Sequence, residues 1–232
     1  MMKLPMLKSS VMKSSLMSLA LISLLGLSVT TGAKAADPLT FGEKQTIRIM
    51  AGQTIGFAMQ AILGINQLAI ISNRSAICTS LVGGIGGAFL AYNPAIGSVT
   101  YESVVKDQDS LAAVKRMKNH PAIYLAFGGE KTKEENLELL RKVLSDMATL
   151  GYNGKIIFHV TTWSQKQVHD IIKTDATIAT YLAKADMTAL TLDLPNSQVA
   201  LNRVTLSNGE LKLHEFGRVG LRQDLVALFK RG

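Results

Sequence analysis

The sequence predicts an α/β domain in which helices cover a mainly parallel sheet. From Ser98 onward, short apolar runs typical of strands alternate with longer stretches of helical periodicity. The connections between them are short enough for parallel βα units with right-handed crossovers. In such a sheet ligands gather at the carboxyl ends of the strands, so we look for a site in the residues that follow each predicted strand.

The first half of this region contains the most clearly marked helix. Thr132 and Glu135 have the spacing of a capping box, an apolar stripe follows, and Gly151 ends the helix. The strand before it ends on Gly128-Gly129. In order, the predicted elements are a strand at 98–105, a helix at 107–118, a strand at 122–127, the helix after Thr132 and a strand at 155–160.

The second half begins with helical residues and ends with strands joined by turns. A helical region follows Ser164 and restarts at Thr174-Asp175. Leu194-Pro195-Asn196-Ser197 and Ser207-Asn208-Gly209 have the composition of turns. The remaining predicted elements are strands at 188–193, 199–206 and 211–216 and a final helix that carries Leu221, Leu225, Leu228 and Phe229 on one face.

The first 35 residues have the composition of a secretory signal peptide. A basic stretch precedes the uncharged apolar run Leu16–Leu27, and Ala33-Lys34-Ala35 places small residues before Ala36. An uncleaved membrane anchor is the alternative. We therefore predict a secreted or periplasmic chain cleaved near Ala35/Ala36, with residues 1–35 as signal peptide, 36–97 as an apolar N-terminal segment of unknown role and 98–232 as the α/β domain.

Charge and cysteine content limit the classes of function. The formal charge is +8, but four of the 25 basic residues lie before Asp37, which leaves 21 basic against 17 acidic groups and a net charge of +4. These charges are dispersed, and no aromatic residues interleave with the small basic clusters Lys115-Arg116-Lys118 and Lys230-Arg231, so we predict no nucleic-acid partner. Cys78 is the single cysteine, so neither a disulfide nor a CxxC motif can form, and we predict a buried, inert thiol.

Two long uncharged runs, between Arg48 and Arg74 and between Arg74 and Glu102, make up most of the segment 36–97 and extend just beyond it. Their amides, glycines and a proline favour a buried α/β segment, and a membrane hairpin with contact through residues 49–97 is the alternative. The glycine cluster lacks the endings of the dinucleotide and P-loop fingerprints. We therefore predict that it serves close helix packing, including a Gly83-xxx-Gly87 contact.

Several motifs of residues 98–206 resemble the Clp-protease/crotonase fold. Ile123-Tyr124-Leu125 followed by Gly128-Gly129 resembles the strand and Gly-Gly turn of Clp-type serine peptidases. Leu194-Pro195-Asn196-Ser197-Gln198-Val199 resembles a turn of that family, and Tyr181-Leu182-Ala183 resembles the helix before it. The alternative is a thioredoxin-like α/β domain without redox activity, which the final hairpin and helix resemble.

The resemblance implies a serine-hydrolase site and also a defect in it. It places the oxyanion hole at the backbone N–H groups of Gly128 and Gly129 and the nucleophile at Ser164. The family's histidine falls on Asn202, which cannot accept a proton at neutral pH. His169 is the candidate for a replacement base, although Asp170 beside it cannot orient it by adjacency.

Two functions of different class follow. The first is a secreted, non-catalytic Clp/crotonase-like pseudoenzyme that serves as a binding or assembly module. The second is a serine hydrolase or peptidase that uses Ser164, His169 and the Gly128-Gly129 oxyanion hole. We predict no cofactor, and the spacing of the four histidines predicts no metal site. The expected partner is an unidentified protein or peptide, and the resemblance implies a homo-oligomer.

Overall fold

The computed structural model describes residues 37–92 and 94–231, which belong to one compact unit. Its centre is a seven-stranded mixed sheet in the order β2-β1-β3-β4-β5-β6-β7. The first five strands of that order are parallel and the last two are antiparallel to their neighbours. The α/β class is therefore confirmed. The strands are β1 (Gln67–Asn73), β2 (Ser98–Val104), β3 (Ala122–Ala126), β4 (Lys155–Phe158), β5 (Met187–Asp193), β6 (Gln198–Ser207) and β7 (Glu210–Gly220).

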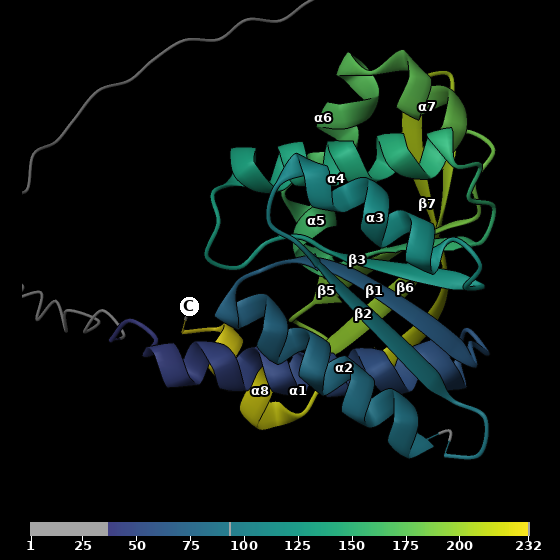
Figure 1. Cartoon of the computed structure of the whole chain (residues 1–232). Helices are drawn as coiled ribbons and strands as arrows, with labels where there is room; N and C mark the ends of the chain where they lie inside the picture. The colour runs from purple at the N-terminus through teal and green to yellow at the C-terminus, as the bar shows by residue number, and fades with distance from the viewer. Residues whose placement is uncertain (1–36, 93, 232) are drawn as a thin grey trace, which may run out of the picture. The chain divides into compact units, whose positions relative to one another are not determined.

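Helices cover both faces of the sheet, and each layer has its own apolar core. Figure 1 shows α1, α2 and α8 on one face and α3, α4, α6 and α7 on the other. The short helix α5 directly follows β4. The helices are α1 (Phe41–Ala61), α2 (Ala76–Tyr92), α3 (Asp107–Met117), α4 (Lys133–Thr149), α5 (Val160–Ser164), α6 (Gln167–Thr174), α7 (Ala176–Leu182) and α8 (Gln223–Phe229).

The segment 37–97, which holds the first uncharged run and most of the second, is an integral part of the fold. It forms α1, β1 and α2, and β1 lies between β2 and β3 with every residue after Gln67 buried. A strand covered by helices on both faces can carry no charge, which explains the composition. A buried α/β segment is therefore confirmed, and it belongs to the same compact unit as the rest of the described chain. Within the described residues, none of the helices combines the length and apolarity that crossing a membrane requires.

Helices α1 and α2 pack with their backbones in close approach. A Cβ on Gly52 would lie 2.4 Å from the Leu81 carbonyl oxygen, and one on Gly84 would lie 2.3 Å from that of Ile49. Gly56 makes the same kind of approach to Ile85. The close packing is as predicted, but the predicted Gly83-xxx-Gly87 pair does not make it: both of these glycines have open space where a Cβ would stand.

Most predicted element boundaries agree with the structure. The Thr132 capping box is present, and the Asp175 side chain accepts from the Ile178 N–H at 2.9 Å, so α7 restarts where predicted. The strand predicted to run to Val160 is shorter. It ends at Phe158, and His159 is the N-cap of α5 instead of a strand residue.

Candidate functional site

The sheet order creates a crevice between the carboxyl ends of β1 and β3. The chain leaves β1 into α2 on one face and leaves β3 into α4 on the other. A doubly wound sheet with the order 2-1-3-4-5 opens at this point, and ligands of such sheets bind outside the strand ends there. The residues that follow β1 and β3 are therefore the candidates for a binding site.

A cavity of about 410 Å³ opens at this place. It lies beside the starts of α1 and α2, the loop after β3 and the end of α8. An ion pair between Arg231 and Glu43 (2.7 Å) connects the end of α8 to the start of α1. Its volume falls in the range of small-molecule sites. The lining residues are Leu39, Lys44, Ile47, Arg48, Ile77, Gly129, Glu130 and Phe229.

A larger hollow of about 720 Å³ lies at the opposite end of the sheet, between α4 and α7. Its two tyrosine hydroxyls donate to backbone carbonyls: Tyr181 to Tyr152 O at 2.8 Å, and Tyr152 to His120 O at 3.2 Å. Lys184 is the one charged residue among those described that line it. With its polar groups already used in the fold, this hollow is a weaker candidate than the crevice.

Buried side chains fix the loop after β3. Asn73, the last residue of β1, donates to Gly128 O and to Asn136 Oδ1, each at 2.6 Å. Asn136 in turn donates to the carbonyl of Thr132 at 2.8 Å. The hydroxyl of Thr162, on α5, donates to the Phe127 carbonyl oxygen at 3.1 Å. The loop is thus anchored to β1, α4 and α5, and its shape is set before any ligand arrives.

Gly129 stands at the open edge of this loop. It has a φ of +78°, and a Cβ there would lie 2.9 Å from Ser75 Oγ and 3.1 Å from Cys78 Sγ. Only glycine fits both conditions. The N–H groups of Gly129 and Glu130 donate no backbone hydrogen bond to the described part of the chain. The predicted Gly-Gly loop therefore carries unused donors on a rigid turn at the crevice.

Two cations of α1 line the crevice one helical turn apart. Lys44 is exposed and Arg48 is partly buried. Neither forms a hydrogen bond or an ion pair with the residues that the structure describes. Burial lowers the pKa of Arg48. The Glu130 carboxylate on the opposite wall accepts from the Ala76 N–H at 3.0 Å, at the start of α2.

Near Arg48, the buried titratable groups Tyr124, His159 and Cys78 are in their uncharged forms. Tyr124 Oη and His159 Nδ1 lie 2.6 Å apart, and both residues are buried. Burial, and then the charge of Arg48, lower the pKa of His159 to about 3. Burial raises the pKa of Cys78, so the predicted buried thiol is confirmed. Arg48 therefore faces no compensating negative charge from this side.

The structure places Ser164 and His169 on the other side of the loop. Ser164 ends α5, and its hydroxyl donates to Thr161 O at 3.3 Å. His169 lies on α6 with its ring against Trp163, at 4.9 Å between ring centroids, and burial lowers its pKa. Within the described residues no hydrogen bond joins Ser164 to an imidazole. Gly128 lies against Thr161 of α5, so the Gly-Gly loop is near Ser164. The arrangement nevertheless does not form a catalytic triad.

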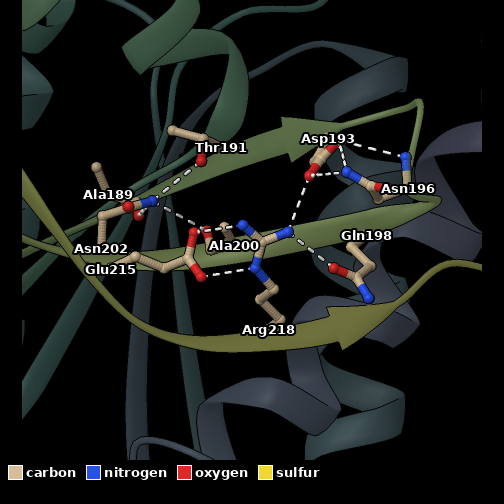
Figure 2. Close-up of polar contacts among 9 residues, drawn as sticks. All are labelled: Ala189, Thr191, Asp193, Asn196, Gln198, Ala200, Asn202, Glu215 and Arg218. Carbon is tan, nitrogen blue, oxygen red and sulfur yellow. Dashed lines mark hydrogen bonds and ion pairs between the residues drawn. The ribbon is translucent and has the colours of Figure 1, made fainter.

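Asn202, at the position the resemblance gave to a histidine, is a sheet residue. It lies on β6 opposite Ala189 of β5, and Figure 2 shows its amide pointing to Thr191 and to backbone carbonyls. The amide donates to Thr191 Oγ1 at 3.0 Å and to Ala200 O at 3.3 Å. The Asn202 side-chain N–H donors are therefore used inside the β5–β6 hairpin.

The Leu-Pro-Asn-Ser motif is the turn of that hairpin. Asp193 accepts from the Asn196 backbone and amide, and its pKa is lowered first by Asn196 and then by Arg218. Arg218 of β7 reaches Asp193 and Gln198, each at 2.9 Å, and forms a two-pronged pair with Glu215 (Figure 2). This network lies at the same edge of the sheet as the crevice, but its groups pair with one another.

Comparisons with known proteins give a family and a set of solved structures of partial similarity. A family model described as "Uncharacterized protein" matches residues 44–228, so the chain belongs to that family. No curated protein matches the sequence. Among solved structures, a solute binding protein of an ABC transporter from Rhodopseudomonas palustris BisB5, in complex with 3,4-dihydroxy benzoic acid, is 12% identical with a TM-score of 0.46 and covers 77% of this chain and 66% of that one.

Two further structures are of related kinds. An extracellular ligand-binding receptor from Verminephrobacter eiseniae is 11% identical with a TM-score of 0.44, over 66% of this chain and 38% of that one. A leucine binding protein from Thermotoga maritima is 12% identical with a TM-score of 0.43, over 75% and 66%. The chain spans between about a third and two thirds of the length of the structures it resembles.

The predicted resemblance to the Clp-protease/crotonase fold is wrong. The structures that the chain resembles are solute-binding proteins, receptors and regulators. The serine-hydrolase and pseudoenzyme interpretations depended on this resemblance and are wrong as well. The prediction of a homo-oligomer also rested on the resemblance alone and is no longer supported. The thioredoxin-like alternative also fails, because the final hairpin extends five parallel strands. The physical reason is that the shared motifs are short: Gly128-Gly129 and Leu194–Ser197 encode turns, which many α/β sheets need.

Proposed function

We propose that the chain is a non-catalytic ligand-binding domain that takes a small organic molecule into the crevice between β1 and β3. The observation that carries this proposal is the unused hydrogen-bonding capacity at that place. Lys44 and Arg48 are unpaired within the described residues, and the Gly129 N–H is a further donor. A fold normally satisfies its polar groups internally, so a preformed cavity with several unmet donors is suited to a ligand.

The architecture supports a binding role over a catalytic one. The crevice residues described above include no nucleophile with a base beside it, because the Cys78 thiol is buried and Ser75 Oγ accepts from the Cys78 N–H. The loop after β3 is anchored from three elements, so it presents fixed donors at little further entropic cost. Recognition by fixed donors and apolar walls is what the site can supply.

A thermal-shift screen of small organic compounds against the protein tests this function. A ligand present at 100 times its Kd stabilises the fold by about 2.7 kcal/mol, which raises Tm by several degrees. Leu39→Trp fills the crevice without changing its charge and should abolish the shift. Thr177→Trp, in the hollow at the opposite end, is the matched control and should leave it intact. A library without hits, or hits lost only in the control, would overturn the proposal.

We also propose that the domain works outside the cytoplasm. The predicted signal peptide lies outside the described residues, and the compact unit begins directly after the predicted cleavage site. A binding domain exported in this way would meet its ligand in the periplasm or the medium. Cell fractionation followed by mass measurement should find a chain that starts at Ala36. A full-length chain in the cytoplasm would contradict export.

A further inference from the structure

Arg48 is in an energetically unusual position. Its side chain is partly buried beside Tyr124, His159 and Cys78, which are uncharged at neutral pH for the reasons given above. Glu130, the one acid among the described residues that line the crevice, accepts from the Ala76 N–H and forms no ion pair with Arg48. A guanidinium removed from water without an anion or acceptor lowers the stability of the fold.

The surroundings of Arg48 divide into a cationic side and an apolar side. Lys44 precedes it by one turn of α1, so the two charges face the same opening. The rest of the wall is largely aliphatic and aromatic, from Ile47, Ile77 and Phe229. A ligand that matched both sides would carry one negative group and a compact apolar body.

We propose that the crevice binds a small carboxylate with an apolar body. The carboxylate is held by Arg48 and Lys44, and the hydrocarbon lies against Ile47, Ile77 and Phe229. Guanidinium and carboxylate match in geometry, since two parallel N–H donors meet two oxygens. This inference rests on the proposed function, because it assumes that the crevice is the ligand site, and it adds the chemical class.

Isothermal titration of the protein with four probes tests the class. Hexanoate, 1-hexanol, hexylammonium and inorganic phosphate vary the charge and the apolar body separately. We expect hexanoate to bind about 10- to 100-fold more tightly than 1-hexanol, the range of a hydrogen-bonded charge pair. Hexylammonium should bind more weakly than 1-hexanol, and phosphate more weakly than hexanoate.

Arg48→Met is the decisive variant, and Lys115→Met on the exposed surface of α3 is its control. Arg48→Met should weaken hexanoate by about 10- to 100-fold and change 1-hexanol less than threefold. It should also raise Tm, because it removes a charge without a partner. The control should change neither affinity. A lower Tm in Arg48→Met would reveal a structural partner for the guanidinium and overturn the inference.

The outcomes separate the two proposals. If 1-hexanol binds in the crevice as tightly as hexanoate, or if phosphate binds best, the carboxylate class is wrong and the ligand-binding function stands. If the four probes and the wider library all fail to bind, the function itself is wrong.

Discussion

At the scale of single residues, Gly129 decides the shape of the crevice loop. Its positive φ disfavours a side chain, and a Cβ there would lie 2.9 Å from Ser75 Oγ. We expect Gly129→Ala to lower the free energy of unfolding by about 2–4 kcal/mol, since strain and overlap add. Gly64→Ala is the control, with a φ of +65° and open space, and should cost about 1 kcal/mol. Equal losses in denaturant titrations would show that Gly129 has room for a Cβ.

His159 gives the fold a pH dependence. Its pKa of about 3 in the folded state lies below the ordinary value near 6.5, so between these values the unfolded chain binds a proton that the folded chain does not. Stability is therefore full above about pH 6.5 and falls by about 1.4 kcal/mol per pH unit below it. His159→Gln should remove most of this slope between pH 6.5 and 5, where few carboxylates titrate, and leave the part due to His169, whose pKa burial also lowers. Identical slopes in the two proteins would contradict a neutral buried imidazole.

Some residues of the candidate site could be predicted from the sequence around them, and others could not. Gly128, Gly129 and Cys78 could be singled out from the sequence, because turn chemistry and cysteine usage are local. Lys44 and Arg48 could not, since their importance depends on where α1 lies relative to β1. The usable signal was the pair of cations, four residues apart, at the edge of an uncharged run. Had residues 67–73 been assigned as a strand, Lys44 and Arg48 could have been recognised as cations on the helix that precedes it.

At the scale of elements, the α1–α2 packing depends on which glycine faces the partner helix. Gly84 is buried against the Ile49 carbonyl, whereas Gly83 is exposed with nothing near it. Gly84→Ala should destabilise the protein by more than 2 kcal/mol, because backbone stands where the Cβ would go. Gly83→Ala should stabilise it by up to about 1 kcal/mol through helix propensity. Thermal unfolding of the two variants distinguishes them, and a reversed order would place α2 in a different rotation.

Elements with strong local signals were the predictable ones. The capping box at Thr132 and the Asp175 cap fix two helix starts through contacts within four residues. The start of α5 at Val160 was not predictable, because the apolar run of β4 continues into it and the cap residue, His159, makes no side-chain capping bond. A turn of helix stabilised by its packing, through Trp163, carries little signal of its own.

At the scale of the whole molecule, the α/β class was predictable and the strand order was not. Alternation of elements requires only local patterns, whereas the place of β1 between β2 and β3 depends on pairing with strands up to 54 residues later in register. The uncharged composition of residues 67–73 is consistent with a central strand and also with a membrane segment. Topology therefore had to come from the structure, and with it the crevice.

The central claim is that this crevice is where a ligand binds. Methyl-labelled protein, titrated with hexanoate or with the best compound of the screen, tests it directly by NMR. We predict that the Ile47 and Ile77 methyl resonances shift first and saturate together, while that of Ile178, in the core of the other layer, stays in place. Shifts confined to the region of Tyr152 and Tyr181, or no saturable shift at Ile47 and Ile77, would contradict the claim.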